Sequence, residues 1–182
     1  MYYMMECFGP VDQERQAIDI VPTGFSWNSG VPFLQSPSHA LEVLMDGDGV
    51  MVSMFNRGIL LWHDELVKAV KSAGVENIDC YDCVLNDPVA GIRYENYKAV
   101  NIIGLVAAAD LDKSVYSTPS GVPLIDTDFD SVVIDKNKTH GFLIFRMAEC
   151  VSAIVVHQAV KDSIENMALP YIDFIPPEKW FG

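Results

Sequence analysis

The stretch that most constrains the fold is an uncharged, β-branched run in the middle of the chain. Residues 99–109 read Ala-Val-Asn-Ile-Ile-Gly-Leu-Val-Ala-Ala-Ala and contain no charged side chain. A run of this kind is typical of a strand that is buried on both faces of a sheet. We therefore expect these residues to form a central strand around which the other elements pack.

The length of the chain sets the size of its core. A chain of 182 residues suits one domain, and it can bury about 70% of its unfolded surface without disulfides or a metal. No apolar run approaches the ~20 residues that a membrane span needs. The first residues, Met1 to Cys7, lack the basic region and cleavage site of a signal peptide. We therefore expect a cytoplasmic protein with no membrane partner.

Gly, Pro, Asn and Asp residues break the hydrophobic runs into short segments, as in many globular chains. Strands are predicted at residues 1–8, 50–55, 78–85, 132–135, 142–146, 154–156 and 171–175. Helices are predicted at residues 39–45, 64–73 and 157–167. Residues 1–182 are expected to form a single α+β domain, with a mixed, mostly antiparallel sheet and about three helices packed on it. Residues 132–146 would form a hairpin of that sheet.

The clearest helix covers residues 64–73. It has acidic residues in its first turn, lysines towards its end and Gly74 as a stop. His63 stands just before it. We interpret this histidine as a polar residue at the helix entry, because no partner for acid-base chemistry is evident nearby in the sequence.

The cysteines indicate neither a disulfide framework nor a metal site. Cys80 and Cys83 form a C-x-x-C, but they lie in a predicted strand, where positions three apart face opposite sides. No second C-x-x-C and no His-x-x-x-His completes a zinc site. The sequence also lacks the common motifs of hydrolases, nucleotide-binding loops and zinc peptidases. We expect free thiols, no metal and no cofactor.

The net charge limits the classes of partner. The chain carries 25 acidic and 12 basic residues, a net charge of −13. Such a chain repels nucleic acids and anionic membranes and attracts basic proteins. The alternative is that the acidity only keeps the protein soluble.

Three aspartates near residue 130 are candidates for contact with a basic protein. Asp126, Asp128 and Asp130 alternate with other residues, which places them on one side of an extended segment. Like charges in one row repel one another, and a basic partner would relieve this repulsion. The alternative is that the row protects a sheet edge against aggregation.

Other charged and aromatic residues have two possible roles. Asp46 and Asp48 belong to an Asp-Gly-Asp-Gly turn that lacks the remaining ligands of a calcium loop, and they are further candidates for partner contact. Trp27 lies in a loop rich in Gly and Pro, where it would either cover the core or serve as an exposed anchor. Lys98 and Arg146 are lone cations in apolar stretches, and we expect both to be paired within the fold.

Several segments spread over the chain carry a family resemblance. They are W-x-x-G-x-P at 27–32, A-G-V at 73–75 before N-I-D at 77–79, Y-K-A-V-N at 97–101, A-D at 109–110, Ser114, L-I-F-R-M at 143–147 and I-V-V-H at 154–157. Together they resemble the DUF1629 immunity-protein family, which is associated with bacterial polymorphic toxin and contact-dependent competition systems. The resemblance implies a non-enzymatic protein that binds and neutralises a cognate toxin.

The resemblance and the charge together give a functional prediction. Toxin domains that attack nucleic acids are basic, and an acidic inhibitor meets such a surface with complementary potential. We expect an immunity protein that blocks a cytosol-acting toxin, such as a nuclease, by occlusion. One alternative is an enzyme or small-ligand binder with a site assembled from His63, Cys83, Asp110 and His157. Another is an adaptor of a secretion system, which would expose a large apolar patch.

Overall fold

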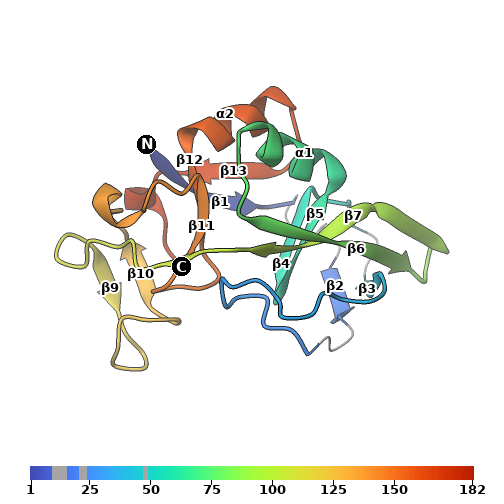
Figure 1. The fold of residues 1–182 in the computed structure, drawn as a ribbon, viewed down its shortest axis with the longest axis horizontal. Helices are drawn as coiled ribbons and strands as arrows, with labels where there is room; N and C mark the ends of the chain where they lie inside the picture. The colour runs from blue at the N-terminus through green and yellow to red at the C-terminus, as the bar shows by residue number, and fades with distance from the viewer. Residues whose placement is uncertain (10–15, 21–23, 47–48) are drawn as a thin grey trace.

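The uncharged run in the middle of the chain connects two β-sheets (Figure 1). It forms the end of β7 (Ile92–Ile102) in one sheet and β8 (Leu105–Val106) in the other. From Ala99 onward β7 is buried, as predicted for a central strand. The prediction of a single strand over residues 99–109 is wrong, because the backbone turns at Gly104, where φ is 135°, and then pairs with the second sheet.

The computed structural model describes residues 1–9, 16–20, 24–46 and 49–182, which form a single, strand-rich domain. The first sheet consists, in order, of β2 (Gln16–Ile20), β3 (Leu41–Asp46), β6 (Ile78–Asp87), β7, β5 (Ile59–His63) and β4 (Met54–Arg57). The second consists of β13 (Ile172–Ile175), β1 (Tyr2–Cys7), β12 (Ile154–His157), β11 (Ile144–Met147) and β8. A separate pair is formed by β10 (Asp128–Ser131) and β9 (Val115–Ser117). The predicted mixed, mostly antiparallel pairing is confirmed, since only β3 with β6 and β8 with β11 are parallel among the described strands.

Two α-helices lie side by side over the sheets, α1 (Asp64–Ser72) and α2 (Gln158–Asn166) (Figure 1). Each begins directly after a histidine, His63 or His157, whose Nδ1 accepts a backbone N–H of the first turn. This bond satisfies one of the free donors at the helix start. The helices predicted in these two regions are confirmed.

The third predicted helix, at residues 39–45, is wrong. The segment forms β3, which pairs in parallel with β6. Leu41, Val43 and Met45 are buried and the residues between them are exposed, which is the two-residue period of a strand. The described residues therefore contain two α-helices, and the fold is mostly β where an α+β fold with about three helices was expected.

The hairpin predicted over residues 132–146 is also wrong. Its first half contributes an isolated bridge between Ala109 and Ile134, and a 3₁₀-helix, η1 (Lys136–Lys138), follows. Its second half forms β11, which pairs with β12 and β8. The turn residues between the halves suggested a local pairing, whereas strands from elsewhere in the chain flank β11.

The two sheets contain the same arrangement of four strands and one helix. The first has the order β6-β7-β5-β4 with α1 after β5, and the second has β13-β1-β12-β11 with α2 after β12. Neighbouring strands within both sets are antiparallel. Each helix has nine residues, and the position after its C-cap has a positive φ, 90° at Gly74 and 49° at Ala168. β1 thus takes the place in the second set that β7 has in the first.

The strand registers of the two sets correspond as well. His63 pairs with Tyr97, and His157 pairs with Tyr2. In both pairs the tyrosine and histidine rings meet edge-on, with ring centroids 5.3 Å apart. Shared order, register and ring contacts make the two sets an internal structural repeat, which we call the duplicated sets, in which the strand equivalent to β7 stands at the start of the chain.

The duplicated sets share one core, and each also has a core of its own. α1, α2 and one face of each sheet enclose the shared core, which contains Trp62 and Val156. The outer face of the first sheet is covered by residues 24–40, which we call the first insertion. The outer face of the second sheet is covered by residues 107–143, which we call the second insertion. Both insertions lie outside the duplicated sets.

Candidate functional site

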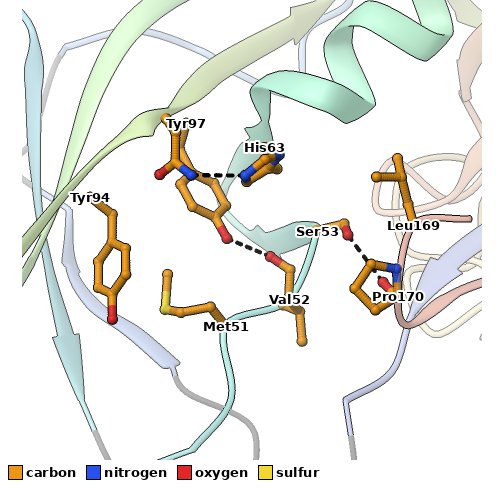
Figure 2. A pocket seen from close by; sticks show the side chains of 9 residues that line it. Met51, Val52, Ser53, His63, Tyr94, Tyr97, Leu169 and Pro170 are labelled. Atoms are coloured by element: carbon orange, nitrogen blue, oxygen red, sulfur yellow. Dashed lines mark hydrogen bonds between the residues drawn. The ribbon is translucent and has the colours of Figure 1, made fainter. Parts of the chain in front are cut away.

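A hollow of about 240 Å³ lies beside the start of α1 (Figure 2). Its polar groups are bonded to its own walls: Tyr97 OH donates to Val52 O at 2.8 Å, and Ser53 Oγ donates to Pro170 O at 3.1 Å. These bonds join β7, the segment before β4 and the segment after α2. The volume lies below the range of about 300–1,000 Å³ that is usual for small-molecule sites.

His63, which lines this hollow, is occupied by structural contacts. Its Nδ1 accepts the N–H of Glu65 at 3.2 Å, and its Nε2 lies 2.8 Å from the side-chain amide of Asn96. Both ring nitrogens thus contact groups of the protein itself, the backbone of Glu65 and the Nδ2 of Asn96. The interpretation of His63 as a helix-entry residue is confirmed.

The fold distributes the four residues of the alternative ligand site over both sheets. His63 and Cys83 lie on the two strands that flank Tyr97 in the first sheet. His157 ends β12 in the second sheet, and Asp110 follows β8, where its ion pair with Lys113 lowers the pKa of the carboxyl. The fold does not bring these four side chains together into one site.

Cys80 and Cys83 are free thiols on opposite faces of β6, as predicted. Cys80 packs against the shared core and Cys83 belongs to the outer core of the first sheet. Burial raises the pKa of Cys80, and it raises the pKa of Cys83 to about 12. Both are therefore protonated at neutral pH, and a protonated thiol is a poor nucleophile.

The described ranges, 1–9, 16–20, 24–46 and 49–182, hold no group of three or more His, Cys, Asp or Glu that could bind a metal ion. The helices in them are too short or too polar to cross a membrane.

Three aspartates form an exposed row on and beside β10, which we call the acidic strip: Asp126, Asp128 and Asp130. The residues between them, Thr127 and Phe129, are 1% and 2% exposed. The predicted placement of the three carboxylates on one side of an extended segment is confirmed. Within the described part of the chain none of the three belongs to an ion pair.

The remaining candidate residues have different outcomes. Asp46 ends β3 and is exposed, whereas Asp48 and the turn predicted around it lie outside the described residues. Trp27 is 4% exposed and packs edge-on against Phe33 and Tyr81, at centroid distances of 4.8 and 5.7 Å. It covers the core of the first sheet, which confirms the first of its two predicted roles, and it is not the exposed residue that the second role required.

The two lone cations also differ. Lys98 Nζ lies 2.9 Å from Asp82 Oδ1, which confirms its pairing within the fold. Arg146 is 1% exposed, and its Nη1 donates to Val151 O at 2.7 Å. Its Nε and Nη2 have no partner among the described residues, and burial lowers its pKa to about 10. The ion pair expected for Arg146 is therefore not formed within that part of the chain.

Sequence reasoning missed a second hollow, of about 470 Å³, which is open rather than enclosed. The first insertion contributes Phe25 and Trp27 to it. Leu105, Ile125 and Val151 also line it, from β8, the second insertion and the β11–β12 turn. A signal existed in the sequence, since the loop before the acidic strip contains the apolar run Val-Pro-Leu-Ile at 122–125.

The chain was compared with models of known protein families and with curated proteins, and neither comparison finds a match. The resemblance to the DUF1629 family therefore stays a prediction from the segments quoted above.

Proposed function

We propose that this chain is an immunity protein that binds a basic bacterial toxin and blocks it by covering its functional surface. The observation that carries the proposal is the acidic strip, three exposed carboxylates on one side of an extended segment. The net charge of −13 and the resemblance to the DUF1629 family support the same function.

The electrostatic argument concerns the rate of encounter. Toxins that act on nucleic acids need a basic surface to approach phosphates. An acidic inhibitor is steered towards that surface, which raises the association rate from about 10⁵–10⁶ to as much as ~10⁸–10⁹ M⁻¹s⁻¹ at low salt. The same contact also relieves the repulsion between the three aspartates. Inhibition then requires occlusion alone and no reaction by the inhibitor.

The proposal is tested first in cells. The protein is co-expressed with the product of the neighbouring gene, which is the candidate toxin. Growth should be restored by this chain and not by an unrelated acidic protein of similar charge. No rescue, or turnover of a substrate that depends on a side chain of this protein, would contradict the proposal.

The role of the acidic strip is tested by charge reversal. Replacement of all three aspartates by Lys should slow association with the toxin at least tenfold at low salt and flatten its dependence on salt. The matched control reverses three exposed carboxylates elsewhere on the surface and changes the net charge equally: Glu76, Glu95 and Asp173. Stopped-flow measurements give both rates. Equal effects of the two triple variants would assign the steering to total charge, and an unchanged rate would remove the strip from the interface.

A further inference from the structure

The second hollow lies directly beside the acidic strip. Ile125 lines the hollow and Asp126, the first residue of the strip, follows it in the chain. Asp126 is bridged to Cys150, and Val151 next to Cys150 also lines the hollow. An apolar surface and a row of carboxylates are thus held together by the same backbone.

Ile125 has an unusual backbone conformation. Its φ is 69°, in the left-handed region that a β-branched residue rarely adopts. Two hydrogen bonds hold it there, from Ile125 N to Ala148 O at 2.8 Å and from Val151 N to Ile125 O at 3.1 Å. Strain that the surrounding structure maintains in this way is found mostly at functional sites.

Packing within the chain does not account for this side chain. Ile125 is 64% exposed, and Leu105 across the hollow is 40% exposed. A strained residue that is largely exposed adds little to the core, so its position is explained better by contact with another molecule.

The hollow lies where the two insertions meet the β4–β5 and β11–β12 turns, which supply Gly58 and Val151. The first insertion supplies Phe25 and Trp27, and the second insertion supplies Ile125. The first insertion is fixed to the segment between β7 and β8 at Gly30, whose carbonyl accepts the N–H of Gly104 at 2.8 Å. The hollow is therefore held in shape by backbone hydrogen bonds of the chain itself, before any partner binds.

We propose that the second hollow receives an apolar side chain of the partner, flanked in the partner by Lys or Arg residues that meet the acidic strip. This inference rests on the proposed function and names the surface that performs it. The partner is a basic protein and not a small molecule, because an open hollow cannot enclose most of a ligand surface. The exposed charge beside the hollow matches such a partner.

The two parts of this surface act on different steps of binding. The acidic strip governs association and is sensitive to salt. The hollow holds an apolar anchor in a site already fixed by backbone bonds, so it governs dissociation and is insensitive to salt. Loss of one anchor contact at the centre of an interface weakens binding by about tenfold or more.

The test replaces Ile125 by Gly in the full chain. Glycine adopts a positive φ without strain, so Ile125→Gly should retain or raise the thermal stability of the free protein. The probe is an inactivated form of the toxin encoded by the neighbouring gene, and surface plasmon resonance gives its rate constants. We expect dissociation to be at least tenfold faster at both low and high salt. The matched control is Val89→Gly, which shortens an aliphatic side chain, 72% exposed, between β6 and β7 at the far end of the molecule from β9 and β10 (Figure 1).

Each outcome supports or overturns the inference. If the toxin binds the wild-type chain and Ile125→Gly dissociates at the wild-type rate, the hollow is not the anchor site, although the proposed function stands. If the toxin does not bind the wild-type chain, the proposed function fails and this inference fails with it. If sedimentation shows that the free protein self-associates and that Ile125→Gly abolishes this, the occupant is a second copy and the inference is overturned.

Discussion

Replacement of His157 by Asn should make the stability of the protein less dependent on pH between about pH 8 and pH 5. His157 Nδ1 accepts the N–H of Ala159 at 3.3 Å at the start of α2, and this bond requires an unprotonated Nδ1. Burial lowers the pKa of His157, the neighbouring amine of Met1 lowers it further, and Asp162 acts in the opposite direction. The folded protein therefore resists protonation of this ring.

The sign of the effect follows from the difference between the folded and unfolded states. In the unfolded chain His157 takes up its proton near pH 6.5, its unperturbed pKa, which is higher than its pKa in the folded protein. The contribution of the neutral cap is complete above about pH 6.5 and decreases as the pH falls through that value towards the folded pKa. An N-cap bond contributes about 1 kcal/mol. For a chain of this size a loss of that amount lowers Tm by about 2–4 °C.

Chemical denaturation of the wild type and of His157→Asn at pH 8 and at pH 5 measures the contribution of the His157 cap to the free energy of unfolding. Asparagine also caps helices and does not titrate, so the difference in unfolding free energy between the two proteins should change by up to about 1 kcal/mol over this range. Burial raises the pKa of Glu6 and of Glu149, but these carboxyls are present in both proteins and their effects cancel. His39→Asn, at an exposed position, is the control and should change nothing. Parallel pH profiles for the wild type and His157→Asn would refute the reasoning.

Three further predictions concern the framework, and thermal or chemical unfolding of the purified variants checks each of them. Ala168→Gly should stabilise the protein by about 0.5–1 kcal/mol, because Ala168 has a φ of 49° at the position where the first set has Gly74. The reverse change, Gly74→Ala, should destabilise the protein by about 1 kcal/mol. A loss of stability in Ala168→Gly would argue against relief of strain. Gly30→Ala should cost more than about 1 kcal/mol, because its φ is 68° and an added Cβ would lie 2.7 Å from the backbone N of Leu105; wild-type stability would show that the chain around Gly30 is pliable. Tyr97→Phe should cost about 1–3 kcal/mol, because it leaves the carbonyl that its hydroxyl contacts without a partner in a buried place; a neutral result would mean that water replaces the hydroxyl.

The elements that could be predicted from the sequence are those whose signals are local. Both helices combine an apolar stripe with a polar residue at their start, and neither depends on distant partners for its recognition. The helix prediction for residues 39–45 is wrong because Ala, Leu, Val and Met in this segment are compatible with a helix and with a strand. The parallel pairing of β3 with β6 decides in favour of the strand, and that contact lies far along the chain.

Of the two parts of the candidate surface, one could be predicted from the sequence and the other could not. The acidic strip could be predicted because alternation in an extended segment places side chains on one side irrespective of the rest of the fold. The second hollow could not, because it exists only where residues 25–29, the turn at Gly58 and Ile125 meet. Trp27 was ambiguous for the same reason, since its burial depends on Tyr81 of a strand well beyond its own loop.

The internal repeat separates the parts of the fold that occur twice from those that occur once. The repeat is hard to find in the sequence because the equivalent strands follow one another in different orders. In the first set β7 comes last, after β6, whereas its equivalent in the second set, β1, comes first in the chain. The pairs His63 with Tyr97 and His157 with Tyr2 occur once in each set, and each histidine caps the start of a helix. The acidic strip and the second hollow occur once, and the strip and Ile125 belong to the second insertion. Substitutions of the exposed Ile125 and of the acidic strip should therefore act mainly on binding to the proposed partner. Changes to the buried Trp27, to Gly30 or to the repeated histidines and tyrosines should act first on stability.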